Sequence, residues 1–136
     1  MTTTGPAPLR PAAALATAVA ELKPRLRGWL HAYAAWISIA SGVVLVVVAA
    51  SLRGGSAGAT TGIYAATVTL LFGTSALYHR INWGPRAHAL MKRLDHSMIF
   101  VFIAGTYTPI AVLTLPRSSA AAVLITVWTG AIFGVL

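Results

Sequence analysis

Four long stretches without a charged residue divide this chain, and they constrain its fold more than any other feature of the sequence. They are residues 28–52, 54–78, 97–115 and 118–136. Each is close to the length of about 20 apolar residues that crosses the hydrocarbon core of a bilayer as a helix. Because backbone groups find no partners in lipid, each span must satisfy them within its own helix. The sequence therefore predicts an all-α, polytopic transmembrane bundle with four spans in this chain.

Composition excludes an ordinary soluble domain. The chain is 57% hydrophobic and 9% charged, whereas about 25% of residues are charged in soluble domains. A transmembrane β-barrel would show alternating segments of roughly 10 residues, and the sequence has no such pattern. Cysteine is absent from the sequence, so neither disulfides nor thiolate metal sites can form.

The positive charges predict the orientation of the chain in the membrane. The net charge is +8, and of the 10 Lys and Arg residues only Arg53 and Arg117 lie in the first and third connections between spans. The others fall into two clusters separated by an even number of spans: Arg10, Lys23, Arg25 and Arg27, then Arg80, Arg86, Lys92 and Arg93. Because cytoplasmic segments are rich in Lys and Arg, residues 1–27 and 80–93 are expected to be cytoplasmic. This distribution explains the charge without a nucleic-acid partner, which we therefore do not expect.

The domain organisation is simple. Residues 1–27 are expected to form a cytoplasmic N-terminal tail, with a short surface helix that ends before Pro24, and residues 28–136 a single transmembrane domain. A cleavable signal peptide is the alternative for the tail. It is disfavoured because the candidate hydrophobic segment is mostly Ala and Thr and Glu21 follows closely.

Polar residues gather where the second stretch ends and the third begins. Ser75 and His79 are four residues apart, so they share one face of a helix. Asp95, one of only two acidic residues, precedes the third stretch. Because the connection between the two helices makes them antiparallel, we expect all three side chains to converge at the cytoplasmic end of the bundle.

Two interpretations of Asp95 remain open from the sequence. In the first, Asp95 has a structural role: it lies in the first turn of the third helix, where an acid caps free N–H groups and favours the helix dipole, or it pairs with Arg93 or Lys92. In the second, Asp95 joins Ser75 and His79 in a hydrophilic site that opens from the cytoplasm and activates a water molecule. The grouping of three polar residues favours the second interpretation without deciding it.

Zinc is the metal that such a site would suit, because neutral imidazole binds it well. A catalytic zinc usually takes three protein ligands, and the sequence contains no His-x-x-x-His or His-Glu-x-x-His pair. His31 begins the first span at the same end and is within reach of the site, but we expect it to face lipid headgroups instead. His96 is rotated about 100° from Asp95 on a helix, so we do not expect both to face one point. From these residues alone, the zinc site is predicted to be incomplete.

Two further patterns concern helix packing. Pro109 is expected to kink the third helix, and neighbouring Thr hydroxyls to satisfy the freed carbonyls, rather than to form a ligand site. Small residues recur four apart, at Ser38 and Gly42, Gly58 and Gly62, and Gly130 and Gly134. Such pairs mark close helix contacts, or they reflect the general abundance of small residues in membrane helices.

Three segments together resemble the hemolysin III family: RGWLH at the first span, SALYHR at the end of the second, and LDHSMIFVFIAGTYTP in the third. That family is part of the wider group of progestin and adipoQ receptors, which also resemble alkaline ceramidases. The resemblance runs from about residue 25 to the C-terminus. It implies the N-terminal part of a seven-helix fold with its N-terminus inside. Because the chain stops within the fourth span, we expect a fragment or a shortened gene model.

The resemblance also implies roles for the three polar residues. In metal-binding relatives, the residue at the position of His79 is a zinc ligand, and the residue at the position of Asp95 holds the zinc-bound water. Ser75 completes the Ser-x-x-x-His motif. Two further ligands come from a His-x-x-x-His on the last helix, which this sequence lacks.

These observations give two hypotheses for an integral cell-membrane protein. The first is a zinc-dependent membrane hydrolase that, in its full-length form, acts on a lipid amide or similar bond. Asp95 would be the general base, and Ser75 would bind the metal-bound water or the oxyanion. The alternative is a non-enzymatic protein, either a pore-forming cytolysin or a sensor of bilayer state. The expected partners are the lipid bilayer and a lipid substrate.

Overall fold

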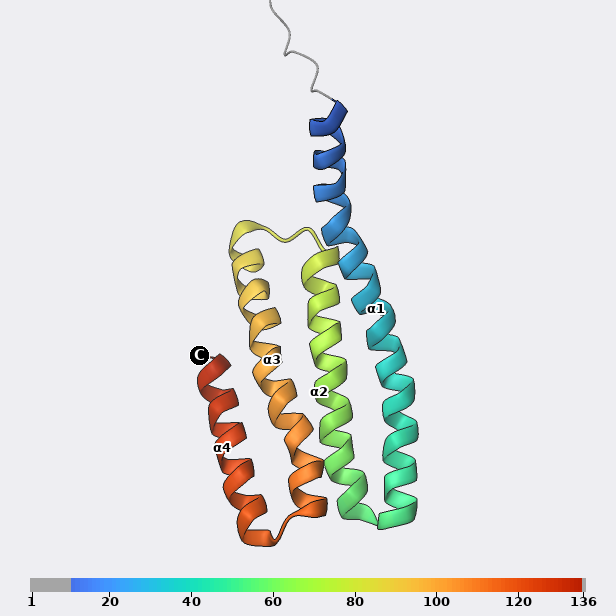
Figure 1. Ribbon diagram of the computed structural model, residues 1–136, viewed down its shortest axis with the longest axis vertical. Coiled ribbons are helices and arrows are strands. Elements are labelled where there is room, and N and C mark those ends of the chain that lie inside the picture. Colours follow the sequence, from blue (N-terminus) through green and yellow to red (C-terminus); the bar gives the residue numbers. More distant parts are fainter. Residues whose placement is uncertain (1–10, 136) are drawn as a thin grey trace, which may run out of the picture.

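The computed structural model describes the backbone of residues 11–135 and the side chains of residue 15 and residues 26–135. The described chain forms four helices joined by short connections, and each runs antiparallel to the one before it (Figure 1). They are α1 (Pro11–Arg53), α2 (Gly55–Arg80), α3 (Pro85–Thr114) and α4 (Arg117–Val135). All four are long and apolar enough to cross a membrane, with the candidate span of α1 beginning at Leu26. The predicted all-α fold with four spans is confirmed.

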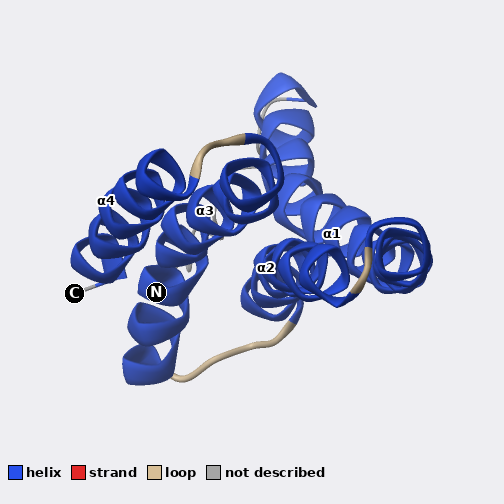
Figure 2. Ribbon diagram, turned by 90° about the horizontal axis from the view of Figure 1, so that it is seen from below, coloured by secondary structure: helices blue, strands red, loops and turns tan. Residues whose placement is uncertain are grey.

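The helices form one open layer. Among the described residues, α1 packs on α2, α2 on α3 and α3 on α4, and no other pair of helices is in contact. Figure 2 shows the four helices from one end, in the order of the sequence. Each helix is therefore uncovered on both faces of the layer, and only the strip that contacts a neighbouring helix is covered.

Small side chains fill the contacts between helices. The buried apolar residues are all alanines, the buried polar residues are all Ser or Thr, and no large side chain in the described part is fully buried. Without a hydrophobic driving force between helices in lipid, close backbone approach and hydrogen bonds between helices hold such a layer together. Ser38 Oγ and Thr69 Oγ1, for example, share a hydrogen bond of 3.0 Å between α1 and α2.

Several glycines explain how closely the helices approach. A Cβ atom added at Gly42 or at Gly58 would lie 2.8 Å from the Cβ of Ala65 or Ala50, respectively. These two positions are close contacts between α1 and α2, as one interpretation of the small-residue spacing predicted. A Cβ at Gly130, by contrast, would meet no atom within 4 Å. The spacing alone therefore does not distinguish contact glycines from exposed ones.

Short turns connect the helices. Gly54 joins α1 to α2 with a φ of 83°, a conformation that glycine adopts without strain. At the other end, the indole Nε1 of Trp83 and the backbone N–H of Ile81 both donate to the Leu77 carbonyl, each at 3.2 Å. These two hydrogen bonds satisfy the end of α2 and bring the chain directly into α3, which begins at Pro85.

Two predicted helix boundaries are wrong. The helix expected to end before Pro24 instead continues, since α1 runs without a break from Pro11 to Arg53. The third helix begins at Pro85, about three turns before the uncharged stretch at residue 97. The physical reason is that a charged residue ends an apolar stretch without ending a helix. The first turns of α3 are polar and extend the helix beyond the part that suits the hydrocarbon core. The part of the expected tail before Pro11 lies outside the described residues.

The helix containing Pro109 is continuous to Thr114. The hydroxyls of Thr106 and Thr108 donate to the carbonyls of Phe102 and Ala104, at 2.9 and 2.8 Å. These are not the carbonyl of Gly105, four residues before the proline, which we expected a Thr hydroxyl to satisfy. Thr108 also accepts a hydrogen bond of 3.1 Å from the Trp128 indole, so this segment serves the packing of α3 on α4.

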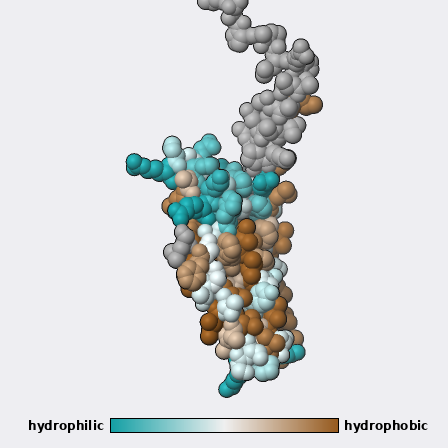
Figure 3. Space-filling model, turned by 60° about the vertical axis from the view of Figure 1, so that its left-hand side comes forward, coloured by the Kyte–Doolittle hydropathy of each residue, from teal (hydrophilic) through white to brown (hydrophobic). Residues whose placement is uncertain are grey.

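One end of the layer carries most of the described positive charge. We call it the basic end, and it comprises Arg27, Arg80, Arg86, Lys92 and Arg93. Figure 3 shows hydrophilic surface gathered at this end and hydrophobic surface along the helices below it.

Candidate functional site

The candidate site is built around the last turns of α2 at the basic end. Ser75 is buried and His79 is half-buried, one turn further along the same helix. Gly28 of α1 packs against this turn, because an added Cβ would lie 3.1 Å from the Cβ of His79 and 2.8 Å from the Cγ of Arg80. The absence of a side chain at Gly28 thus lets α1 approach the backbone of α2 beside His79.

That approach brings a second histidine into the site. His31, one turn after Gly28 on α1, shares a hydrogen bond of 2.8 Å between its Nδ1 and Ser75 Oγ. Its ring centroid is 6.1 Å from that of His79 and 5.9 Å from that of Phe72. The expectation that His31 faces lipid headgroups is therefore wrong. The Gly-x-x-His spacing in RGWLH was a signal for this, because glycine allows the close helix contact that the histidine then uses.

Asp95 reaches the site from the middle of α3. The helix begins at Pro85, with Gly84 as its N-cap, and no acidic residue lies in its first turn. Asp95 is thus ten residues past the helix start, where the backbone N–H groups are already bonded within the helix. The capping interpretation of Asp95 is therefore wrong, whereas its pairing with Arg93 or Lys92 stays a prediction.

A small cavity joins the three helices at this level. It has a volume of about 240 Å³. Its polar lining comprises His31, Ser75, Asp95 and His96, and its apolar lining comprises Leu71, Phe72 and Ile99. Ser75 and Asp95 therefore face one space, as the convergence of the two helices predicted. A cavity of this size accommodates a few water molecules or one small group of a larger ligand.

His79 borders this cluster without lining the cavity. Its imidazole interacts electrostatically with Asp95, with His31 and with Arg27. The centroid of its ring also lies 4.7 Å from that of the Tyr78 ring, with the two planes tilted by 55°, and the Tyr78 ring lies 5.2 Å from that of His88. The three residues predicted from sequence are thus neighbours at the basic end, together with His31.

His96 occupies a less buried position. It is exposed, and its Nδ1–H donates to the carbonyl oxygen of Lys92 at 2.7 Å. It nevertheless lines the same cavity as Asp95. Lining one cavity does not bring the two side chains to one point, because they leave the helix about 100° apart. The expectation that Asp95 and His96 do not converge on a single atom stays a prediction.

The donor set does not form a zinc site by itself. Within the part of the chain whose side chains are described, no three His, Asp or Glu residues are close enough to hold a metal ion together. His31 uses one ring nitrogen for Ser75, and His79 and Asp95 alone fall short of the three protein ligands usual for catalytic zinc.

Comparison with known proteins places this geometry in a family. The family model described as Haemolysin-III related matches residues 19–136, which include every residue of the site. The chain belongs to this family. Among curated relatives, it is 35% identical to "Hemolysin-3" of Bacillus cereus over 106 residues, which are 78% of this chain and 48% of that protein. It is 30% identical to "Hemolysin-3 homolog" of Bacillus subtilis (strain 168) over 106 residues, 78% of this chain and 49% of that protein.

The Haemolysin-III chain described here thus spans about half the length of the curated relatives it matches. No solved structure matches it. The resemblance seen in the sequence motifs is confirmed at the level of the family, and the roles of individual residues remain predictions.

Proposed function

We propose that the full-length protein is a membrane hydrolase that cleaves a lipid amide or similar bond in the cavity between α1, α2 and α3. The observation that carries this proposal is the grouping of His31, Ser75 and Asp95 around one cavity of about 240 Å³ in a membrane-spanning chain. A carboxylate in the middle of a helix, beside a hydroxyl and an imidazole, has no capping role to explain it. It suits general base catalysis.

Each side chain has a defined task in this reaction. Asp95 takes a proton from a water molecule, whose oxygen then attacks the amide carbonyl carbon. Ser75 donates its hydroxyl hydrogen to the oxyanion that forms. Asp95 returns the proton to the departing amine as the carbon–nitrogen bond breaks, leaving a fatty acid and an amine.

His31 controls whether the Ser75 hydroxyl is available. When the proton of His31 lies on Nδ1, this nitrogen donates to Ser75 Oγ across the 2.8 Å contact, and the hydroxyl hydrogen is left for the substrate. When Nδ1 is unprotonated, Ser75 donates to it instead. The proposal requires the first tautomer during the reaction.

Zinc enters the proposal only with additional ligands. His79 would supply one, and at least two more must come from outside the residues described here. Bound zinc would supply Lewis acidity and a more acidic water.

The proposal includes an orientation. Both the N-terminal side of α1 and the connection from α2 to α3 lie at the basic end (Figure 1). By the positive-inside rule, this end faces the cytoplasm. The cavity would then take its water from the cytoplasm and its substrate from the inner leaflet.

A ceramide-type lipid is the substrate for the test. The full-length protein is reconstituted in vesicles with ceramide, and released fatty acid is measured by mass spectrometry with and without zinc. We expect Asp95→Asn to lower turnover by a factor on the order of 10² to 10⁴, and His79→Ala to abolish zinc-dependent turnover. Wild-type activity in a well-folded Asp95→Asn protein contradicts the mechanism.

The names of the curated relatives favour a second candidate, a cytolytic protein that makes membranes leaky. A pore predicts release of a trapped dye from vesicles by the wild type and equally by His79→Ala. A hydrolase predicts no dye release from vesicles of uncharged lipids, and it predicts that His79→Ala loses turnover. The two measurements on one preparation separate the candidates.

A further inference from the structure

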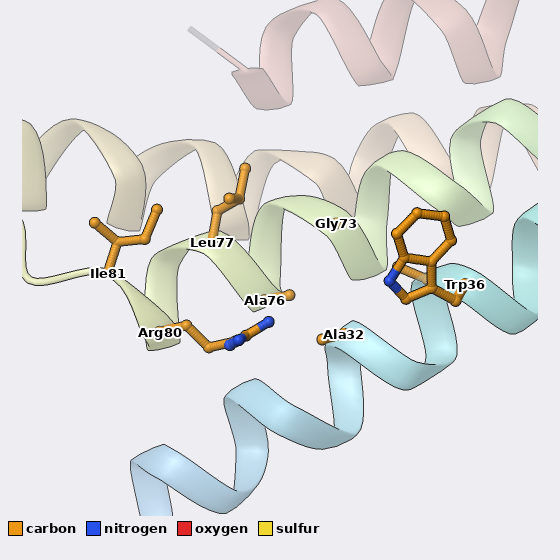
Figure 4. A pocket seen from close by; sticks show the side chains of 8 residues that line it. Ala32, Trp36, Gly73, Ala76, Leu77, Arg80 and Ile81 are labelled. Carbon is orange, nitrogen blue, oxygen red and sulfur yellow. The ribbon is translucent and has the colours of Figure 1, made fainter.

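A groove follows the α1–α2 contact on the side away from the polar cavity. Its first part, at the basic end, has a volume of about 540 Å³. Figure 4 shows Arg80 and Trp36 toward its two ends, with the small residues Ala32, Gly73 and Ala76 between them. Ser75, which lines the polar cavity, is one residue from Ala76 and so points about 100° away from it.

The groove continues toward the middle of the membrane. A second part, of about 550 Å³, is lined by Ile39, Val43 and Val46 of α1 and by Ala66 and Leu70 of α2, among others. On α1, the lining residues 32, 36, 39, 43 and 46 are spaced four and three apart, and on α2 residues 80, 77, 73, 70 and 66 repeat this spacing. Such spacing defines one stripe on each helix, so the two parts form a single groove.

The groove is long enough to cross the hydrocarbon of one leaflet. From residue 32 to residue 46, α1 rises about 21 Å, compared with about 15 Å for half of the hydrocarbon core. The second part is lined by aliphatic side chains and a few small polar ones, Ser38 and Thr69, which already bond each other. A long and mainly apolar groove of this kind fits an acyl chain, which lies parallel to the helices in a bilayer.

The basic end of the groove adds a charged anchor. The Arg80 guanidinium carbon lies 4.1 Å from the centroid of the Trp29 ring. Stacking on an aromatic face fixes the plane of a guanidinium and leaves its N–H edge for two phosphate oxygens. Asp95, the one acidic side chain that the structure describes, lines the polar cavity instead. Tryptophans at this depth also suit the headgroup region.

We propose that the α1–α2 groove binds one phospholipid with an anionic headgroup, its acyl chain along the two stripes and its phosphate on Arg80. This site is separate from the polar cavity, and the proposal does not depend on hydrolytic activity. Two features argue for lipid as the occupant: the positive charge at one end only, and a length sufficient to hold a lipid chain across one leaflet.

The test is native mass spectrometry of the purified 136-residue chain in detergent with equimolar dioleoyl phosphatidylglycerol and dioleoyl phosphatidylcholine. We expect one retained lipid per chain, with phosphatidylglycerol preferred about five-fold, the effect of one Arg at a membrane surface. Arg80→Gln should remove the preference. Arg86→Gln, which loses the same charge at the same end of the layer, should keep it.

Filling the groove provides a second arm. A Cβ at Gly73 meets no atom within 4 Å, so Gly73→Leu should occupy the groove without disturbing the helices and lower retention of both lipids. Gly130→Leu is the matched control, because that position is also open but lies on α4 outside the groove. Ala66→Leu, at an exposed position in the second part of the groove, repeats the test if Gly73→Leu loses helix content.

Four outcomes overturn the proposal. They are equal retention of the two lipids by the wild type, loss of the preference in Arg86→Gln as well as in Arg80→Gln, unchanged retention in a folded groove-filling variant, and dimers without lipid. The last would show that a second copy of the chain covers the groove.

Discussion

The hydrogen bond between His31 and Ser75 links α1 to α2 through two side chains that also line the polar cavity. A buried hydroxyl in lipid usually bonds to a carbonyl of its own helix, as those of Thr60 and Thr61 do here. Ser75 instead pairs with an imidazole on α1 at 2.8 Å. Because the imidazole nitrogen changes from acceptor to donor with its tautomer, this contact couples the packing of α1 to the chemistry of the cavity.

A double-mutant cycle on His31→Ala and Ser75→Ala measures this bond. We expect a coupling free energy of about 0.6 kcal/mol, and at most about 1.7, the range found for such bonds between membrane helices. Unfolding in mixed micelles gives the free energies of unfolding of the wild type, the two single variants and the double variant. A control cycle on His31→Ala and Thr114→Ala should show no coupling, because Thr114 bonds to Ile110 of its own helix at the other end of the layer. Zero coupling for His31 and Ser75 would mean that the bond contributes nothing to the fold.

The position of Asp95 in mid-helix predicts the opposite order of stability for its Ala and Asn variants from the order that a capping role predicts. At an N-cap, Asn is better than Ala by about 1 kcal/mol. In a helix interior, Ala is better than Asn by up to about 0.7 kcal/mol. Since Asp95 lies ten residues past Pro85, we expect Asp95→Ala to have a larger free energy of unfolding than Asp95→Asn. The opposite order would restore a capping role.

At the scale of the helices, hydrophobicity predicted the membrane spans well and the helix ends poorly. The first two uncharged stretches, residues 28–52 and 54–78, agree to within two residues with the spans Leu26–Arg53 and Gly55–Arg80, which is the usual uncertainty of a helix end. The start of α3 could not be read in this way, because Arg86, Lys92 and Arg93 interrupt the apolar pattern while the helix continues. Likewise, the partner of His31 depends on the close contact at Gly28, which hydrophobicity does not reveal and which only the Gly-x-x-His spacing indicates.

The approach of α2 to α3 depends on Gly105, which gives a prediction at this scale. A Cβ there would lie 2.7 and 2.8 Å from two carbons of Thr67. We expect Gly105→Ala to lower the free energy of unfolding by about 1–3 kcal/mol through overpacking. Gly130→Ala, where the added Cβ meets nothing, should instead raise it by up to about 1 kcal/mol through helix propensity.

Thermal unfolding followed by circular dichroism distinguishes the two glycines. Thr67→Ala should partly rescue Gly105→Ala, because it removes the side-chain atoms beyond Cβ that meet the added methyl group. If both glycine variants change stability in the same direction, the close contact between α2 and α3 is not what Gly105 provides.

At the scale of the whole molecule, the layer has two different sides. One holds the polar cavity, with its carboxylate, hydroxyl and imidazoles, and the other holds the α1–α2 groove, which is mainly apolar and has Arg80 at its end. A polar cluster in a membrane is stable only where it faces protein or water. Since the curated relatives are about twice as long as the part that this chain matches, we expect the polar side to face the remainder of the full-length fold and the groove side to face lipid.

The orientation of the layer is open to a direct test, because the chain contains no cysteine. Asn82→Cys places a single thiol in the connection between α2 and α3 at the basic end, and Ser118→Cys places one at the opposite end, both at exposed positions. By the positive-inside rule, a membrane-impermeant maleimide added to intact cells should label Ser118→Cys only. After the membrane is permeabilised, it should label both, which shows that each thiol is reactive. Labelling of Asn82→Cys alone in intact cells would show that the orientation is the reverse of the one proposed. The polar cavity would then lie at the outer leaflet, where cytoplasmic water does not reach it.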